Sequence, residues 1–267
     1  MALPVGGGGL GLVVLLLAVL FGGNIFGGGT GVDVGPRLDP FPQAPEPGPG
    51  EGLANAPDPD AQLVEFVEFV VADVQDAWER QFAEAGRDYQ ETQLVIFEDQ
   101  VSTACGQATS AVGPFYCPAD ALVYLDLGFF RELATRFGAP GDFAQAYVIA
   151  HEFGHHVQNI LGISDEVGQA QQADREGANE LSIRLELQAD CFAGIWGHST
   201  YEDQQLEEGD LEEGLAAAAA VGDDRIQAQT SGSIRPETWT HGSSEQRVEW
   251  FRRGFDTGDP NTCDTFS

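Results

Sequence analysis

Two stretches in the second half of the chain carry apolar residues at helical spacing. In the first stretch, apolar residues three or four apart predict one buried helix face: Phe143, Ala146, Tyr147, Ala150, Gly154, Val157 and Leu161. Pro140-Gly141 is a turn signal, Asp142 is a good N-cap residue, and Gly162 stands where a helix is expected to end. The pattern therefore predicts a helix from Asp142 to Leu161.

The second stretch begins near Arg184 and repeats apolar residues on one face: Leu185, Ala189, Phe192, Ala193 and Trp196. Three further segments have helical periodicity, at residues 61–85, 129–137 and 206–221. Short apolar runs at residues 94–97 and 122–125 are typical of strands. Together these elements predict an α+β fold with an excess of helix.

The amino-terminal segment is apolar enough to cross a membrane. Its first 32 residues carry no charged side chain, and an apolar run from Leu10 to Phe21 lies among glycines. Extended to Phe26, the run reaches the ~17–25 residues that a membrane helix needs. We expect residues 1–26 to form a single transmembrane anchor; the alternative is a cleaved signal peptide, but no A-x-A site follows the run. No Lys or Arg precedes Arg37, so the positive-inside rule gives no orientation.

Residues 27–60 have the composition of a linker. Eight prolines lie between Pro36 and Pro59, with glycines, acidic residues and few large apolar residues. Such a segment buries too little surface to fold and forms a semi-extended spacer. The remaining residues, 61–267, suit one domain.

The predicted helix from Asp142 to Leu161 contains the sequence HEFGH, in which His151 and His155 are four residues apart. Residues at this spacing lie on the same face of a helix, so both imidazoles can reach one zinc ion. Glu152 is placed to take a proton from a water at the metal. Ordinary surface or core histidines are the alternative, but three of the five histidines of the chain lie within six residues here.

A zinc peptidase site needs a third protein ligand, and Glu186 is the best candidate. Glu186 and Asp190 are four residues apart on the second predicted helix, flanked by apolar residues rather than by other charges. One carboxylate can bind the metal while the other holds a ligand imidazole by its second nitrogen. Two solvated acids on a helix surface are the alternative in so acidic a chain.

HEFGH followed by a helical E-x-x-x-D resembles the gluzincin metallopeptidases, the group of thermolysin. That resemblance implies Glu186 as the third zinc ligand, Asp190 as the residue that orients His151, and an edge strand lining the cleft. Leu122–Leu125 is our candidate for that strand, and residues 164–179 for a loop over the cleft. Four segments resemble the bacterial putative neutral zinc metallopeptidase family more closely: RFGAPGDFAQAYVIAHEFGHHVQNILGI, RLELQADCFAGIW, VGDDRIQ and THGSSEQRVEWFRRGF.

A late segment with His241 and Arg247 adds candidate catalytic groups. Negative charge develops on the carbonyl oxygen when water attacks an amide, and a fixed donor lowers that barrier by a few kcal/mol. His241 or Arg247 is our candidate donor, and Ser243 or Ser244 is expected to cap the helix that carries Arg247. The segment looks like the late His-to-Arg segment of HtpX-type membrane metallopeptidases. A loop histidine and a surface ion pair are the alternatives.

The four cysteines indicate disulfides in an exported domain: Cys105, Cys117, Cys191 and Cys263. Cys105 and Cys117 bracket a short Gly/Ser/Pro segment. Pairing Cys191 with Cys263 would staple the carboxyl terminus to the helix of Glu186. Free buried thiols or a cysteine metal site are the alternatives, but no C-x-x-C spacing supports them. We therefore expect a single-pass protein of the cell membrane with an extracytoplasmic catalytic domain.

The charge balance is strongly acidic, with 12 basic and 43 acidic residues and a net charge of −31. Such a surface repels nucleic acid and anionic lipid. Adaptation to high salt and a codon bias acting on an exported domain both account for it. The field also favours neutral or cationic substrate segments.

These observations predict a membrane-anchored zinc endopeptidase acting on a peptide or protein. One zinc ion would be held by His151, His155 and Glu186, with Glu152 as general base. A non-hydrolytic zinc-binding scaffold of the same fold and a zinc hydrolase of a cell-wall amide are the alternatives. Glu152 argues against the scaffold, because a structural zinc site has no use for that acid.

Overall fold

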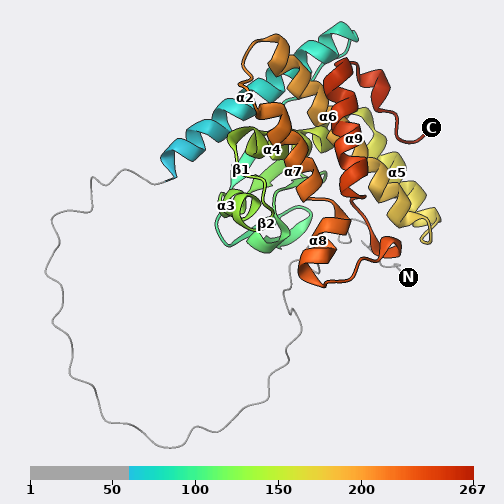
Figure 1. Ribbon diagram of the computed structural model, residues 1–267. Helices are drawn as coiled ribbons and strands as arrows, with labels where there is room; N and C mark the ends of the chain where they lie inside the picture. The colour runs from blue at the N-terminus through green and yellow to red at the C-terminus, as the bar shows by residue number, and fades with distance from the viewer. Residues whose placement is uncertain (1–59) are drawn as a thin grey trace, which may run out of the picture.

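The helix of the HEFGH sequence and the helix of Glu186 pack against each other in the centre of the fold (Figure 1). They are α4, Asp142–Leu161, and α6, Ala178–Glu202, in a computed structural model of the chain that describes residues 60–267. Gly154 lets them approach closely, because a Cβ there would lie 2.9 Å from the carbonyl oxygen of Ala189 on α6. The predicted bounds of α4 are confirmed, with Gly162 in the left-handed conformation at its end.

The start of α4 differs from the expectation in one detail. The N-cap is Gly141 rather than Asp142, which is the first helical residue and accepts a hydrogen bond from the Phe143 N–H at 2.8 Å. Gly141 has a φ of +124°, and a Cβ on it would lie 1.9 Å from the Glu213 carboxylate. A glycine is therefore required where Glu213 approaches the amino end of this helix.

Within residues 60–267, six further helices surround α4 and α6: α2 Ala61–Glu84, α3 Gly128–Thr135, α5 Ile163–Ala173, α7 Asp210–Ala220, α8 Asp223–Thr230 and α9 Ser244–Thr257. The three segments with helical periodicity are confirmed as α2, α3 and α7, although α7 begins only at Asp210. Ser243 caps α9, as expected for one of the two serines, and forms a capping box with Gln246.

The expectation of a loop at residues 164–179 is wrong, because α5 occupies most of this segment. Its alanines and glutamines favour helix, and Asp165 and Glu166 lie in the first turn, where acidic side chains stabilise the helix dipole. Val167 is buried and gives the helix an inward face. These contributions outweigh the flexibility of Gly168.

The main sheet has three strands in the order β1-β5-β4. β1, Leu94–Ile96, runs parallel to β5, Leu122–Leu125, and β4, Phe115–Cys117, runs antiparallel to it. Both strands expected from apolar runs are present, but the expectation that Leu122–Leu125 is an edge strand is wrong. It pairs on both sides, which agrees with the burial of three of its four residues. A separate hairpin joins β2, Gln100–Thr103, to β3, Gly106–Thr109.

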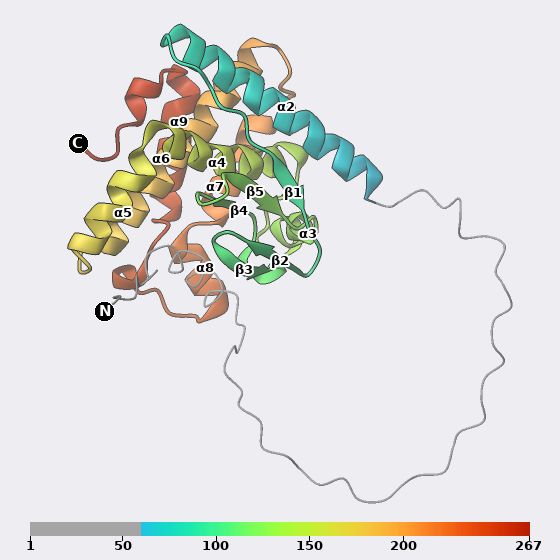
Figure 2. The same cartoon turned by 180° about the vertical axis from the view of Figure 1, so that it is seen from behind.

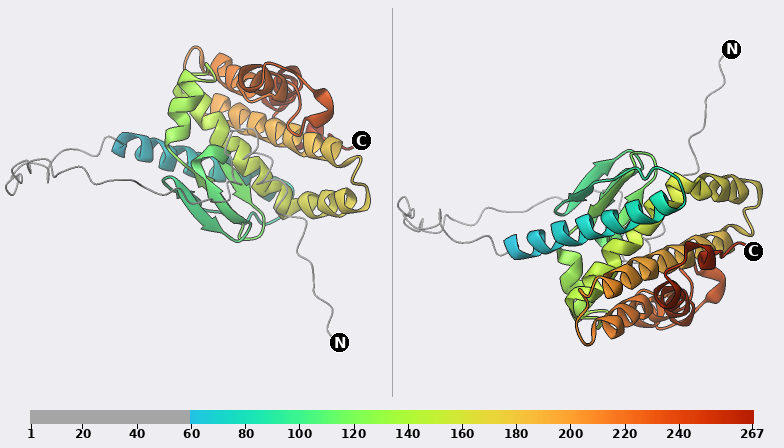
Figure 3. Two further views of the ribbon diagram at one scale, coloured as in Figure 1. Left: turned by 90° about the horizontal axis from the view of Figure 1, so that it is seen from below. Right: turned by 90° about the horizontal axis from the view of Figure 1, so that it is seen from above.

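The elements form layers, which are seen best end-on (Figure 3). α2 and the sheet lie on one side, α4 and α6 in the middle, and α7 and α9 on the other; Figure 2 shows α2 and the sheet from behind. One large core cluster joins these layers, with fully buried side chains that include Phe137, Tyr147, Phe153 and Phe251. The fold is therefore a helix-rich α+β domain, and its central layer carries the HEFGH sequence.

Two disulfides join the four cysteines as expected, Cys105 with Cys117 and Cys191 with Cys263. The second joins α6 to the short 3-10 helix Pro260–Cys263, close to the carboxyl terminus. The anchor expected at residues 1–26 and nearly all of the linker expected at 27–60 lie outside the described residues. Within residues 60–267, no helix combines the length and the apolar character needed to span a bilayer.

Candidate metal centre

His151, His155 and Glu186 converge where α4 faces α6. Nε2 of His151 lies 3.2 Å from Oε2 of Glu186, and Nε2 of His155 lies 3.5 Å from Oε1. Two ligand atoms on a tetrahedral zinc ion with bonds of about 2.0–2.1 Å lie about 3.3–3.4 Å apart. Donor types and spacing therefore fit one zinc ion, and among the described residues this group supplies three ligands.

Glu152 follows His151 on α4 and is buried, with 8% of its surface exposed. Burial raises the pKa of its carboxyl group, and the imidazoles of His151 and His155 oppose that rise. Glu152 adjoins His151 and precedes His155 by three residues on α4, so it lies next to the candidate ligands on this helix. A carboxyl group so placed can exchange protons with a water there.

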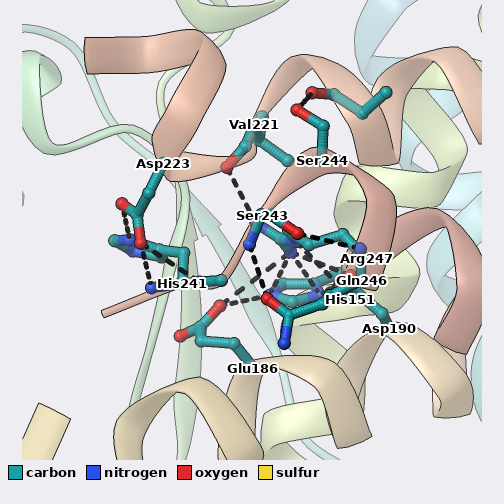
Figure 4. A network of polar contacts seen from close by, with 12 residues as sticks. His151, Glu186, Asp190, Val221, Asp223, His241, Ser243, Ser244, Gln246 and Arg247 are labelled. Atoms are coloured by element: carbon teal, nitrogen blue, oxygen red, sulfur yellow. Dashed lines mark hydrogen bonds and ion pairs between the residues drawn. The ribbon is translucent and has the colours of Figure 1, made fainter. Parts of the chain in front are cut away.

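A charged network contacts His151 at Nδ1, the ring nitrogen that does not face Glu186 (Figure 4). Its Nδ1 lies 2.9 Å from Oδ1 of Asp190, a fully buried carboxylate. Arg247 donates two hydrogen bonds of 2.8 Å to the same carboxylate, from Nε to Oδ2 and from Nη2 to Oδ1. Tyr147 donates to Oδ1 at 2.5 Å. Because a carboxylate only accepts, Nδ1 of His151 carries a proton, and Nε2, which faces Glu186, is the nitrogen that can bind a metal.

The pKa values around Asp190 reflect this network. Burial alone would raise the pKa of the Asp190 carboxyl group, but the charges of Arg247 and His151 outweigh burial and lower it. Burial likewise disfavours the charged form of His151, but Asp190 outweighs it and raises the pKa to about 9. The Asp190 carboxylate is therefore ionised in the folded protein near neutral pH.

Arg247 is 3% exposed, and its remaining contacts are also inside the protein. Nη1 donates to the carbonyl oxygen of Val221 at 3.1 Å, and Nη2 donates to the Tyr147 hydroxyl at 3.3 Å. Nη2 also lies 3.9 Å from Oε2 of Glu186. These contacts show Arg247 supporting Asp190; donation to a substrate oxygen stays a prediction.

His241 is held from the other side, by Asp223 at the start of α8. Oδ2 of Asp223 accepts three main-chain N–H bonds, from Thr240, His241 and Gly242, at 2.8, 2.7 and 3.1 Å. Nδ1 of His241 lies 3.2 Å from Oδ1. Burial opposes protonation of His241, but the charges of Glu186 and Asp223 raise its pKa. In the zinc-free protein, these charges therefore favour the imidazolium form of His241.

The other two histidines have structural partners. His156 donates from Nε2 to the carbonyl oxygen of Gln90 at 2.6 Å, and its Nδ1 lies 3.0 Å from the Tyr116 hydroxyl. His198 donates from Nδ1 to the carbonyl oxygen of Phe255 at 2.7 Å. Among the described residues, neither histidine belongs to the group that converges at the candidate metal centre.

Sequence reasoning assigned no role to two residues next to the ligands. Tyr147 lies one turn before His151, and Gln158 lies one turn after His155, where Nδ1 of His155 is 2.8 Å from its Oε1. Tyr147 was assigned to the buried apolar face of α4, whereas Gln158 lies on the same flank of the helix as the two histidines. Their role requires the partners on α6 and α9, which spacing along one helix does not reveal.

Comparisons with known proteins agree with this geometry. The family model of putative neutral zinc metallopeptidases matches residues 1–266. The uncharacterised protein YpfJ of Escherichia coli K12 is 47% identical over 266 residues, covering 99% of this chain and 88% of that relative. The uncharacterised protein Rv2575 of Mycobacterium tuberculosis H37Rv is 53% identical over 190 residues, covering 67% of this chain and 64% of that relative. No solved structure gives a significant match.

The family model spans nearly the whole chain, including the HEFGH helix, the Glu186 helix and the segment from His241 to Arg247. The resemblance noted from four sequence segments is therefore confirmed. The chain belongs to the putative neutral zinc metallopeptidase family.

Proposed function

We propose that this protein is a zinc-dependent metalloendopeptidase. The observation that carries the proposal is the convergence of two imidazole nitrogens and one carboxylate, 3.2 and 3.5 Å apart, beside the buried Glu152. A structural zinc site is normally closed by four protein ligands. The group found within residues 60–267 has three, which leaves a position for water and substrate.

The residues around the site suit peptide hydrolysis. A zinc ion bound here supplies Lewis acidity and makes water a nucleophile near neutral pH. Glu152 removes a proton from the attacking water and delivers it to the leaving amine. His241 is oriented by Asp223, and its imidazolium form can donate to the developing charge on the substrate carbonyl oxygen.

The location of the enzyme is a further part of this proposal. Residues 1–26 anchor the chain in the cell membrane, and residues 27–60 carry the catalytic domain away from it on the extracytoplasmic side. The two disulfides support this side, because they persist in oxidising compartments.

The purified full-length chain, loaded with zinc, would be incubated with an unbiased peptide library and with cell-wall fragments. We expect cleavage of peptides, loss of cleavage with a chelator, and loss with Glu152→Gln. Glu208→Gln, on an acid outside the site, is the matched control and should cleave normally. Stoichiometric zinc binding without cleavage of any peptide would disprove the proposal, and cleavage of cell-wall amides alone would favour that substrate instead.

The ligand set has its own test, which needs no substrate. We expect Glu186→Ala to lower zinc affinity strongly, because it removes one of three protein ligands. Metal analysis after dialysis measures the change. Unchanged zinc content would remove Glu186 from the site.

A further inference from the structure

A chain of hydrogen bonds between neutral groups runs from His155 to the carboxyl-terminal tail. Nδ1 of His155 lies 2.8 Å from Oε1 of Gln158. Nε2 of Gln158 donates to Oε1 of Gln188 at 3.1 Å, and Nε2 of Gln188 donates to the carbonyl oxygen of Cys263 at 3.0 Å. The chain therefore crosses from α4 to α6 and from α6 to the tail.

The direction of this chain is set by main-chain carbonyls, which accept hydrogen bonds and cannot donate. Nε2 of Gln158 also donates to the carbonyl oxygen of Leu185, at 2.7 Å. Rotating the Gln158 amide by half a turn would place its oxygen against that carbonyl oxygen. Rotating the Gln188 amide would do the same at Cys263. Gln158 must therefore present its oxygen to His155, and Gln188 must present its oxygen to Nε2 of Gln158.

This direction determines which nitrogen of His155 carries the proton. An amide oxygen opposite Nδ1 requires a proton on Nδ1, and Nε2 then keeps the lone pair that a metal needs. Gln158 is fully buried and Gln188 is 5% exposed. Water therefore cannot easily replace a lost partner, and a wrong amide orientation would leave buried polar groups unpaired.

The far end of the chain is held firmly. Cys263 is buried and bonded to Cys191 of α6 by a disulfide. Two residues further on, the Thr265 hydroxyl donates to the carbonyl oxygen of Arg184 at 2.7 Å, and Nη1 of Arg184 donates to the carbonyl oxygen of Thr265 at 3.2 Å. The tail thus provides a fixed acceptor for Gln188.

We propose that Gln158 and Gln188 form a neutral relay, anchored by the Cys263 carbonyl, that fixes His155 in its metal-binding tautomer. Both glutamines are positioning residues and act through His155. The inference rests on the proposed function in one respect, because it takes His155 as a zinc ligand.

Zinc affinity, measured on the full-length chain by competition with a chromophoric chelator, tests the relay. Gln158→Met should weaken zinc binding by ~10–100-fold, the usual effect of losing a partner of a ligand imidazole. Gln188→Met should weaken it less, because Gln158 keeps the Leu185 carbonyl. The double variant should be no weaker than Gln158→Met alone, since both changes interrupt one chain.

Gln75→Met is the matched control. Gln75 lies on α2 and accepts a hydrogen bond from the Thr92 N–H at 2.8 Å, outside the metal centre. Its replacement also removes a hydrogen bond of a glutamine and should leave zinc affinity unchanged. An equal loss with Gln75→Met and Gln158→Met would show a general effect of destabilisation and overturn the relay.

The tautomer can be read directly from the imidazole nitrogen resonances of the zinc-free, ¹⁵N-labelled chain. We expect a proton on Nδ1 of His155 in the wild type, and a shift of that proton toward Nε2, which faces the Glu186 carboxylate, in Gln158→Met. Gln188→Met leaves the contact of His155 itself in place, so it carries the test if Gln158→Met does not fold. A wild-type tautomer and wild-type zinc affinity in a folded relay variant would overturn the inference.

Neither measurement needs a substrate, so the two proposals can fail separately. If the relay variants lose zinc affinity but the wild type cleaves no peptide, the relay stands and the peptidase proposal fails. If the wild type cleaves peptides and the relay variants bind zinc normally, the peptidase proposal stands and the relay fails.

Discussion

The two histidines of the candidate metal centre are held in different ways, although they lie one turn apart on the same helix. His151 is backed by ions: a buried carboxylate, Asp190, which Arg247 neutralises through two hydrogen bonds. His155 is backed by two amides and a main-chain carbonyl, all of them neutral. A charged network and a neutral one therefore support the same candidate metal centre.

The difference reflects the cost of burying charge. A carboxylate makes a ligand imidazole more basic, but its burial must be compensated by a cation. Asp190 has such a cation in Arg247; a carboxylate behind His155 would need another. Amides avoid this need, because hydrogen-bond direction selects the tautomer without adding charge to a site that already contains Glu152 and Glu186.

The largest effect is expected when the charged network behind His151 is disrupted at Asp190. Asp190→Asn keeps the shape but removes the carboxylate that Arg247 contacts at 2.8 Å and leaves only that of Glu186, at 3.9 Å, which should destabilise the fold by about 3–5 kcal/mol. Zinc affinity should fall by about 10–100-fold as well. Urea unfolding and chelator competition measure the two changes.

A double variant separates loss of the ion pair from exposure of an unpaired charge. Asp190→Asn with Arg247→Met removes both ions, so it should be more stable than Asp190→Asn alone. Zinc affinity should stay low in both, because His151 has lost its carboxylate in each. Equal stability of the single and double variants would show that Arg247 does not depend on Asp190 as its counterion.

The charged network was easier to predict from sequence than the neutral one. Asp190 stands four residues after Glu186 on one helix, so spacing alone connects it to the site. Gln188 lies between these acids, but its partners come from α4 and from the tail, and only the crossing of these segments brings them together.

The errors in the predicted fold have related causes. The strand Phe115–Cys117 has three residues and lies close to prolines, so no local pattern marked it. Without it, the pairing of β5 on both sides was not foreseeable, and Leu122–Leu125 was expected at an edge. The α4 helix was predicted correctly at both ends because a turn signal precedes it and a C-terminal glycine follows it.

The disulfide between Cys191 and Cys263 holds the far end of the neutral network. Replacing Cys191 and Cys263 by alanine removes a disulfide that closes a separation of 72 residues, which should destabilise the protein by about 2–4 kcal/mol. Zinc affinity should fall less than in Gln158→Met, because the tail keeps its contacts with Arg184. Chelator competition on the folded variant measures this zinc affinity.

The other disulfide provides the matched control. Replacing Cys105 and Cys117 by alanine opens a loop with a separation of 12 residues between the β2–β3 hairpin and β4. This variant should also be less stable but should bind zinc normally. An equal loss of zinc affinity in both variants would mean that disulfides act on the site only through general stability.

The third prediction concerns Gly154, at the point where α4 and α6 bring both networks together. In Gly154→Ala, the new Cβ would lie 2.9 Å from the carbonyl oxygen of Ala189 and 3.1 Å from its Cα, so the helices must move apart. We expect the free energy of unfolding to fall by about 1–3 kcal/mol, despite the better helix propensity of alanine. Zinc affinity should fall with it, because Glu186 moves relative to both histidines.

Gly168→Ala on α5 is the control for helix propensity. A Cβ at Gly168 meets nothing within 4 Å. The free energy of unfolding of this variant should therefore rise by up to about 1 kcal/mol, and the variant should bind zinc normally. A stabilising effect of Gly154→Ala in the same urea experiment would contradict the close approach of α4 and α6.

The smallest effect is expected at the pair of His241 and Asp223, which belongs to neither network. Despite burial, the pKa of Asp223 is lowered by His241 and by main-chain N–H groups, and the pKa of His241 is raised by Glu186 and Asp223. The Asp223 contribution is complete above its unfolded pKa of about 3.9 and is lost as pH falls through the lowered folded value. The His241 contribution is complete below about 6.5 and is lost as pH rises through the raised folded value.

The pair should therefore stabilise the zinc-free fold most between about pH 4 and about pH 6.5. We expect His241→Gln to lower the free energy of unfolding by about 1 kcal/mol within this window and by less at higher pH. Urea unfolding of both proteins across the pH range measures the difference. A difference that grows with rising pH would contradict the raised pKa, and with it the imidazolium that we assign to His241 as donor to the substrate oxygen.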